Sequence, residues 1–393
     1  MTMTIGEKKS SLINEERLLH DFLELAKLNG PSGQEQRIAD YLVPRLEAMG
    51  FSIQFDEAHK QFDGECGNLV AYWEGTDPTV RPLFLSTHMD TVLPTEGLKP
   101  EIRDGIIYSD GTTILGADDR AALASYLEAI QSIQEAGMPC GPIELILTVN
   151  EQRGLTGSRH MDYSLIKSKE GYVFDSSGDV GQIILQGPYS SKIYVELNGK
   201  SSHIGLNPEE GINAFLIAAV VLKQLKLGKI SEDTLANIGM IQGGELSSII
   251  PGQVELVGEV RSFTEQGLYD QLNEMKETAE AVAREHGGHA NVRFEKKYLG
   301  FHVKEDTALG QNAVQAAQNM NISYYLTRTL GGADTNVLNE NGLTCITLGN
   351  GFRNIHTFRE HISVENLINT GIYTVSLIRS WYQAHKDQGA VSK

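Results

Sequence analysis

The pattern of apolar and polar positions predicts helices and strands that alternate along the first part of the chain. Apolar residues at helical spacing predict helices over residues 14–29, 35–49 and 121–136. Strand-length apolar runs occupy residues 51–55, 69–73, 82–90, 143–149 and 171–175. Helices and strands that alternate in this way predict an α/β layer fold.

A different order of elements begins near Pro188. The pattern predicts a strand, a helix, two strands, a helix and a strand, over residues 191–197, 211–227, 237–242, 254–261, 265–285 and 291–297. This β-α-β-β-α-β order is typical of a ferredoxin-like arrangement. The α/β pattern then resumes with predicted elements at residues 308–320, 344–348 and 364–385. Because 393 residues are too many for one simple core, we predict a discontinuous domain of residues 1–187 and 298–393 and an inserted domain of residues 188–297.

Polar side chains follow three of the predicted strands at the point where each strand ends. His88 and Asp90 end the first of these strands, Glu151 follows the second, and Asp175 ends the third. In open α/β sheets, ligand sites gather beyond the carboxyl ends of the strands. Imidazole and carboxylate groups are the ligands that zinc and similar cations take in proteins. The sequence therefore predicts a cation site at one edge of the sheet, although a single His-x-Asp at a strand end is more often a structural pair.

Composition and charge exclude several other classes. The net charge of −18 disfavours nucleic acid and anionic membranes as partners. We find no apolar run of the ~20 residues that a membrane helix needs, and residues 1–9 lack the apolar core of a signal peptide. Three widely spaced cysteines without a Cys-x-x-Cys pair favour reduced, buried thiols. We therefore expect a cytoplasmic enzyme.

The motifs together resemble the M20 family of co-catalytic zinc peptidases, most closely its peptidase T-like, tripeptide aminopeptidase branch. The resemblance covers nearly the whole chain in order. The segments that carry it are Thr87–Val92, Gly116–Arg120, Glu151–Gly154, Phe174–Asp175, Gly199–Gly205, Arg261–Ser262, Gly331–Asn336 and His356–Thr357. It implies a zinc-exopeptidase-like α/β/α catalytic domain with an inserted ferredoxin-like α+β domain that serves as lid and dimerisation domain.

The resemblance also implies a role for each matching residue. Asp118, and not Asp119, would bridge two divalent ions, zinc or alternatively manganese or cobalt. The expected metal ligands are His88, Asp118, Gln152, Asp175 and His356. Glu151 would be the general base toward a metal-bound water, and Asp90 would orient His88. On the substrate side, the implied residues are His203 from the partner subunit of a homodimer, Arg261 at a substrate carboxylate, and Asp334 and Asn336.

Some of these residues also have ordinary structural interpretations. Asp118 and Asp119 at a predicted helix start could simply cap that helix. His203 could be a surface histidine, Arg261 a member of a surface ion pair, and Asp334 a cap in a loop. These alternatives remain open at the level of sequence.

Two positions depart from the family pattern. The family has a glutamate where this chain has Gln152. A glutamine amide is neutral and a weaker donor, so the second metal should bind less tightly or with a different preference. Ser248 stands where the family often has asparagine, which leaves the fine substrate specificity open.

The favoured function is metal-dependent removal of the N-terminal residue from small peptides. Alternatives are a related M20 amidohydrolase of the carboxypeptidase or deacylase kind, and a weakly active or inactive peptide binder because of Gln152. A dinucleotide-binding enzyme is disfavoured, since no Gly-x-Gly-x-x-Gly follows an early strand.

Overall fold

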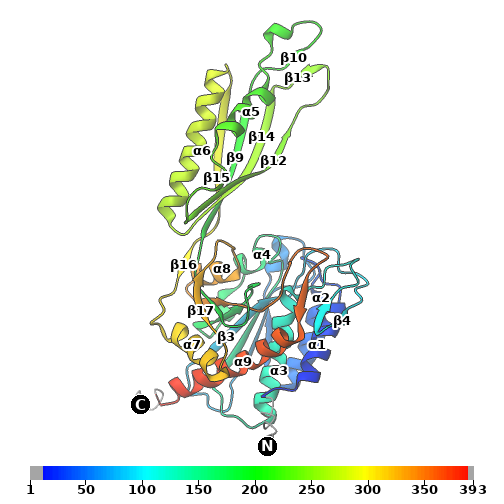
Figure 1. Ribbon diagram of the computed structural model, residues 1–393, viewed down its shortest axis with the longest axis vertical. Helices are drawn as coiled ribbons and strands as arrows, with labels where there is room; N and C mark the ends of the chain where they lie inside the picture. The colour runs from blue at the N-terminus through cyan, green and yellow to red at the C-terminus, as the bar shows by residue number, and fades with distance from the viewer. Residues whose placement is uncertain (1–11, 388–393) are drawn as a thin grey trace, which may run out of the picture. The chain divides into compact units, whose positions relative to one another are not determined.

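The computed structural model of the chain describes residues 12–387 and divides into two compact units (Figure 1). The first unit comprises Met1–Leu185, Val303–Thr327 and Ala333–Lys393, and the second Gln186–His302 and Arg328–Gly332. The predicted insert of residues 188–297 lies within the second unit. Residues 1–9, where the sequence predicts no leader, lie outside the described residues.

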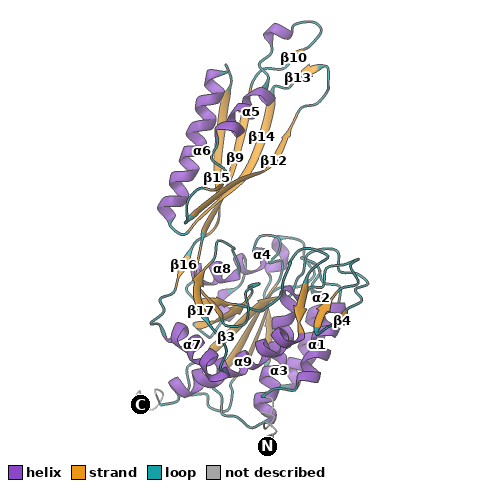
Figure 2. Ribbon diagram, viewed as in Figure 1, coloured by secondary structure: helices purple, strands orange, loops and turns teal. Residues whose placement is uncertain are grey.

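A mixed sheet forms the centre of the first unit (Figure 2). Its strand order is β1-β2-β6-β3-β7-β18-β8, with β16 and β17 both pairing with β8. The bounds are β1 Ser52–Phe55, β2 Leu69–Trp73, β3 Leu83–His88, β6 Ile143–Thr148, β7 Glu170–Phe174, β8 Gln182–Gly187, β16 Phe301–His302, β17 Tyr325–Arg328 and β18 Thr344–Leu348. Strands β6, β3, β7 and β18 are mutually parallel, so their carboxyl ends meet at one edge.

Helices cover both faces of this sheet, as the α/β/α prediction requires. They are α1 Glu15–Lys27, α2 Gln36–Ala48, α3 Ala117–Glu135, α4 Thr156–Arg159, α7 Ala308–Met320, α8 Asp334–Glu340 and α9 Val364–His385, with 3₁₀ turns at Ala58–Gln61 and Tyr163–Leu165. Two neighbouring residues of β7 contact helices on opposite faces of the sheet. Phe174 meets Tyr126 of α3 and Tyr373 of α9 edge to face, whereas Val173 packs in a cluster with Leu338 of α8. The fold-class prediction is confirmed.

Side-chain caps explain why several helix boundaries could be predicted from the sequence. Thr307 accepts a hydrogen bond from the Gly310 N–H at the start of α7, and Ser363 accepts one from Asn366 at the start of α9. Such caps satisfy backbone donors that the first turn leaves free. Both helices have the bounds that the sequence predicts.

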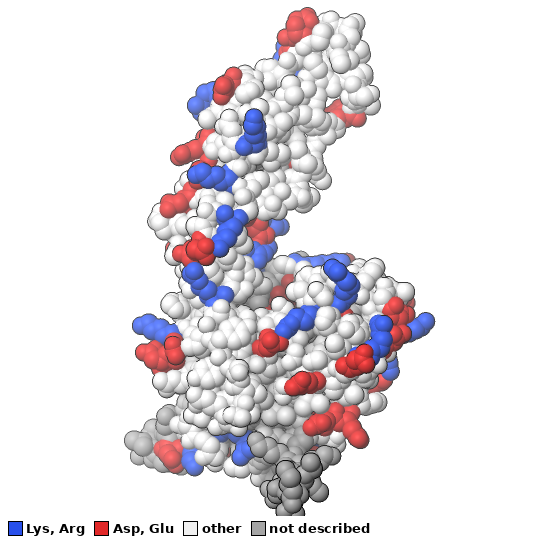
Figure 3. Space-filling model, in the orientation of Figure 1, with Lys and Arg blue, Asp and Glu red and all other residues white. Residues whose placement is uncertain are grey.

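The second unit is a ferredoxin-like domain, as predicted. Its sheet has the order β11-β12-β14-β9-β15, and the paired strands are antiparallel. The bounds are β9 Tyr189–Asn198, β10 Ser202–His203, α5 Ala214–Gln224, β11 Gly228–Lys229, β12 Thr234–Gly243, β13 Ile249–Ile250, β14 Gln253–Ser262, α6 Glu265–Glu285 and β15 His289–Tyr298, with a 3₁₀ turn at Pro208–Glu210. Helices α5 and α6 pack on this sheet over a core that includes Val195, Val221 and Leu272. On the face shown in Figure 3, α6 displays side chains of both charge signs, as solvated helices commonly do.

A small three-stranded sheet joins two parts of the chain that are far apart in sequence. Strands β4 Glu101–Arg103 and β5 Ile106–Tyr108 form a hairpin, and β19 His361–Ser363 pairs with β5. This pairing anchors the chain immediately after the loop that carries His356. Within residues 12–387, none of the helices combines the length and apolar character needed to cross a lipid bilayer.

Candidate metal centre

The three predicted strand ends meet at one edge of the central sheet. His88 is the last residue of β3, Glu151 lies shortly after β6, and Asp175 directly follows β7. Donor atoms of His88, Asp118 and Asp175 all lie within 4.8 Å of one another. This cluster can hold a divalent cation, because it offers one imidazole nitrogen and two carboxylates.

Asp118 stands at the centre of the cluster. One of its carboxylate oxygens, Oδ1, lies 3.0 Å from His88 Nε2, and the other, Oδ2, lies 3.2 Å from His356 Nε2. Burial alone would raise the pKa of Asp118, but the hydrogen bonds with the two histidines outweigh burial and lower it. A carboxylate that offers one oxygen to each histidine has the geometry of a bridge between two cation positions.

Asp119 points elsewhere, although it neighbours Asp118 in sequence. Its carboxylate accepts hydrogen bonds from Thr87 Oγ1 at 2.5 Å and Asn350 Nδ2 at 2.6 Å. Neither carboxylate is turned toward the α3 backbone: the Asp118 side chain meets His88 and His356, and the Asp119 side chain meets Thr87 and Asn350. Helix capping, one of the interpretations that the sequence allowed, is therefore wrong for this pair.

Gln152 also reaches the cluster. Its side-chain amide nitrogen donates to Asp118 Oδ2 at 3.0 Å and lies 3.5 Å from His88 Nε2. The residue that departs from the family pattern is thus brought to the position where a ligand is expected. In this arrangement the NH₂ group of the Gln152 amide faces Asp118. To coordinate a cation there, the amide would have to present its oxygen atom instead.

Glu151 is buried, and burial together with the nearby Asp175 charge raises the pKa of its carboxyl group well above the usual range. Burial and the Asp118 charge raise the pKa of Asp175 to about 7. Acidic groups crowded in this way destabilise each other's charges, and bound cations would offset that repulsion. The donor set and its electrostatics therefore fit divalent metal ions.

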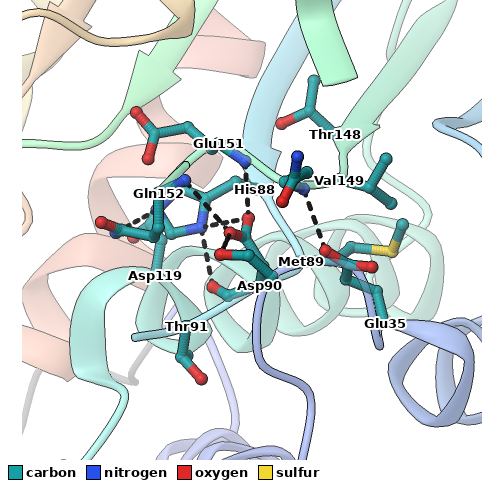
Figure 4. A network of polar contacts seen from close by, with 12 residues as sticks. Glu35, His88, Met89, Asp90, Thr91, Asp119, Thr148, Val149, Glu151 and Gln152 are labelled. Atoms are coloured by element: carbon teal, nitrogen blue, oxygen red, sulfur yellow. Dashed lines mark hydrogen bonds and ion pairs between the residues drawn. The ribbon is translucent and has the colours of Figure 1, made fainter. Parts of the chain in front are cut away.

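Asp90 contacts His88 through both its backbone and its carboxylate. The closest contact of His88 Nδ1 is the backbone carbonyl oxygen of Asp90 at 2.8 Å, and the Asp90 carboxylate oxygen Oδ1 is 3.4 Å away. The carboxylate also accepts hydrogen bonds from the backbone N–H groups of Glu151 and Gln152 (Figure 4). The ring is thus oriented chiefly by the backbone of residue 90.

No sequence motif indicates a role for Glu360, four residues beyond His356. Its buried carboxylate accepts hydrogen bonds from the backbone N–H groups of Gly116 at 2.8 Å and Asp118 at 3.0 Å. It therefore fixes the backbone that carries the central aspartate. Only a three-dimensional contact between residues 118 and 360 reveals this role.

Asp334 and Asn336 are buried at the start of α8, whereas the sequence analysis placed them in a loop. Asp334 accepts hydrogen bonds from Thr148 and Ser158 at 2.5 Å each, and Asn336 accepts one from the Ala333 N–H. Contact of these two residues with substrate stays a prediction.

The remaining predicted residues belong to the second unit. His203 is exposed on β10, where its Nδ1 accepts a hydrogen bond from the Gly205 N–H. Arg261 near the end of β14 donates to Glu259 at 2.7 Å and to the carbonyl oxygen of Leu330 at 2.9 Å. Glu259 also pairs with Lys297, so Arg261 takes part in a local ion-pair network.

A histidine–carboxylate cluster at the carboxyl edge of an α/β sheet fits a metal-dependent enzyme. Comparison with known proteins gives the family. The chain belongs to peptidase family M20/M25/M40, which residues 84–380 match.

Relatives of similar length support this assignment. The uncharacterized protein YqjE of Bacillus subtilis is 36% identical over 367 residues, 93% of this chain and 99% of the relative. Aminopeptidase PepT of Bacillus cereus is 37% identical, with a TM-score of 0.87, over 94% of this chain and 99% of that one. A tripeptidase of Staphylococcus aureus is 36% identical, with a TM-score of 0.91, over 95% of this chain and 100% of that one.

Proposed function

We propose that this protein is a di-metal aminopeptidase that removes the N-terminal residue from small peptides, tripeptides above all. The observation that carries the proposal is the Asp118 carboxylate between His88 and His356, with Glu151 close by on the β6 loop. The names of the Bacillus cereus and Staphylococcus aureus relatives support the substrate class.

Each ligand has an assigned place. His88 and Asp175 would complete one metal site and His356 and Gln152 the other, with Asp118 shared by both and zinc as the first candidate. Two such ions supply an acidified water and polarise the scissile carbonyl group. Asp90 accepts hydrogen bonds from the backbone N–H groups of Glu151 and Gln152, and Glu360 accepts one from the backbone N–H of Asp118.

Glu151 acts as the general base in this proposal. It would take a proton from the attacking water and return it to the leaving amine, and burial raises the pKa of its carboxyl group, which favours holding that proton between the two steps. His203, from the partner subunit, would donate a hydrogen bond to the developing oxyanion. Arg261 would bind a substrate carboxylate through the part of its guanidinium group that Glu259 and Leu330 leave free.

Gln152 should weaken the second metal site. Replacing Gln152 with glutamate restores a negative charge beside Asp118, so we expect metal content to rise toward two ions per chain and kcat to rise with it. The measurement is metal per chain after dialysis against a series of buffered free-zinc concentrations. Gln61→Glu, the same change at an exposed site, is the control. Equal zinc titration curves for Gln152→Glu and wild type would refute the weakened site.

The second unit offers an edge for dimerisation. Beyond Ala236, strand β12 pairs with β14 on one side, and no residue among 12–387 pairs with its other side. Met240 and Ile241 on this edge are 53% and 56% exposed, and Leu216 of α5 is 64% exposed. Edge strands with exposed apolar residues readily pair with another strand. A second copy of the chain is the proposed occupant.

Light scattering tests the dimer. We expect twice the chain mass for the wild type and the monomer mass for Ile241→Lys, because lysine blocks edge pairing and charges an apolar contact. Ile102→Lys, at an exposed isoleucine of the first unit, should leave the mass at the dimer value. A monomeric wild type at micromolar concentration would contradict the proposal.

Dependence on a free amino terminus separates the proposed function from its alternatives. An aminopeptidase should cleave trialanine and release its first residue, but leave N-acetyl-trialanine intact. A deacylase-like amidohydrolase would release acetate from the second compound, and a carboxypeptidase-like enzyme would remove its last residue. Failure to cleave either compound under any metal addition would favour the peptide-binder alternative that Gln152 motivates. The cytoplasmic location stays a prediction.

A further inference from the structure

The loop that carries Glu151 and Gln152 is held by two buried carboxyl groups from distant parts of the chain. The Asn150 N–H donates to Glu35 Oε1 at 2.9 Å. The Glu151 N–H donates to Asp90 Oδ1 at 3.0 Å, and the Gln152 N–H to Asp90 Oδ2 at 3.1 Å. Three successive backbone donors are thus bound by two carboxyl groups (Figure 4).

Glu35 comes from the turn between α1 and α2 and is completely buried. Its Oε1 also accepts a hydrogen bond from the Gly33 N–H at 2.7 Å, so the turn is folded around the same oxygen. Ser32 of this turn donates to Asp90 Oδ2 at 2.5 Å. The two carboxyl groups and the turn therefore form one connected hydrogen-bond network.

The backbone turns sharply at Asn150. Asn150 has φ of 53°, in the left-handed region that asparagine adopts more readily than most other residues with a side chain. This conformation changes the direction of the chain just after β6. It thereby sets the positions of Glu151 and Gln152, which Figure 4 shows, and places the Gln152 amide against Asp118. Without the bond to Glu35, the turn would lose the group that fixes its first amide.

We infer that Glu35 is a positioning residue: its carboxyl group, together with Asp90, fixes the 150–152 backbone and so sets where the general base and Gln152 point. The effect of Glu35 on the reaction rate rests on the proposed function. Its effect on the 150–152 backbone does not. Sequence motifs gave no role to Glu35, because the predicted second helix simply included it.

The electrostatics of Glu35 provide a conservative variant. Burial and the Asp90 charge raise the pKa of Glu35 to about 7, so a neutral side chain of the same shape is tolerated there. In Glu35→Gln, the amide oxygen can still accept both backbone hydrogen bonds. Glu35→Ala removes the acceptor, and Glu35→Asp draws it back by one methylene group.

Hydrogen–deuterium exchange on metal-free protein tests the inference independently of catalysis. In Glu35→Ala, amides of a peptide covering residues 150–152 should exchange about tenfold faster than in wild type, the ratio expected for one lost hydrogen bond. Glu35→Asp should be intermediate, and Glu35→Gln should match wild type. A peptide from β12 in the second unit serves as the internal reference.

Kinetics on the metal-loaded variants supply the second measurement. Glu35→Ala should lower kcat by about 10–100-fold with little change in KM, as loss of a supporting contact does, and Glu35→Gln should restore it. Wild-type exchange at residues 150–152 in Glu35→Ala would overturn the inference, as would a Glu35→Gln variant as impaired as Glu35→Ala. If Glu35→Ala does not fold, Glu35→Asp carries the same comparison. A wild type without peptidase activity would defeat the proposed function and leave the exchange result to decide the backbone role.

Discussion

Replacing Asp118 with asparagine is expected to remove both metal sites together and to lower kcat by about 10³-fold or more, since the two ions contribute several kcal/mol to the barrier reduction. Asp118 joins the two histidines, because one of its carboxylate oxygens lies 3.0 Å from His88 Nε2 and the other 3.2 Å from His356 Nε2. An asparagine keeps one oxygen but places an amide nitrogen where the second cation needs a donor oxygen. A substitution that removed only one of the two ions would leave the other ion bound.

Metal analysis and circular dichroism together measure this prediction. Asp118→Asn should bind less than one ion per chain at zinc concentrations that load the wild type, with an unchanged spectrum. Asp306→Asn, the same change at an exposed carboxylate, should behave as wild type. Retention of two tightly bound ions by Asp118→Asn would show that another group bridges the sites.

Replacing Glu151 with glutamine should separate proton transfer from metal binding. We expect kcat to fall by about 10²–10⁴-fold, the usual contribution of a positioned general base, while metal content stays at the wild-type value. The fold should tolerate the change, because burial already raises the pKa of Glu151 and so disfavours its charged form. A neutral amide of the same shape removes that electrostatic cost.

Steady-state kinetics with trialanine and metal analysis of the same samples provide the measurement. Glu151→Asp keeps a carboxylate at a shorter reach and should retain part of the rate, whereas Glu47→Gln, at an exposed position, should be silent. A Glu151→Gln variant with the wild-type kcat would assign the base to another residue. A variant that lost its metals would instead make Glu151 a ligand.

The parts of the site that lie at strand ends could be predicted from the sequence. Apolar runs that stop at His88 and Asp175 indicate buried strands, and parallel strands bring their carboxyl ends to one edge. The assignment of Asp118 over Asp119 came from the family resemblance. The structure supplies a physical reason, since Thr87 and Asn350 hold the Asp119 side chain away from the cluster.

The supporting groups could not be predicted. Glu35 and Glu360 act through backbone N–H groups more than a hundred residues away, and backbone donors leave no signature in side-chain patterns. The short helix α8 was also missed, because its seven residues are too few to show helical periodicity. Strand β8 was missed as well, since it follows a glycine-rich loop without a motif.

Metal content combined with peptide cleavage is the most direct measurement of the central claim. Dialysed protein would be loaded with Zn²⁺, Mn²⁺ or Co²⁺ at increasing free concentration, with metal per chain and trialanine hydrolysis followed in parallel. We predict one tight and one weaker ion per chain, with release of free alanine and dialanine that rises as the second ion binds. Hydrolysis that saturates with the first ion, or no hydrolysis with two ions bound, would contradict a di-metal aminopeptidase.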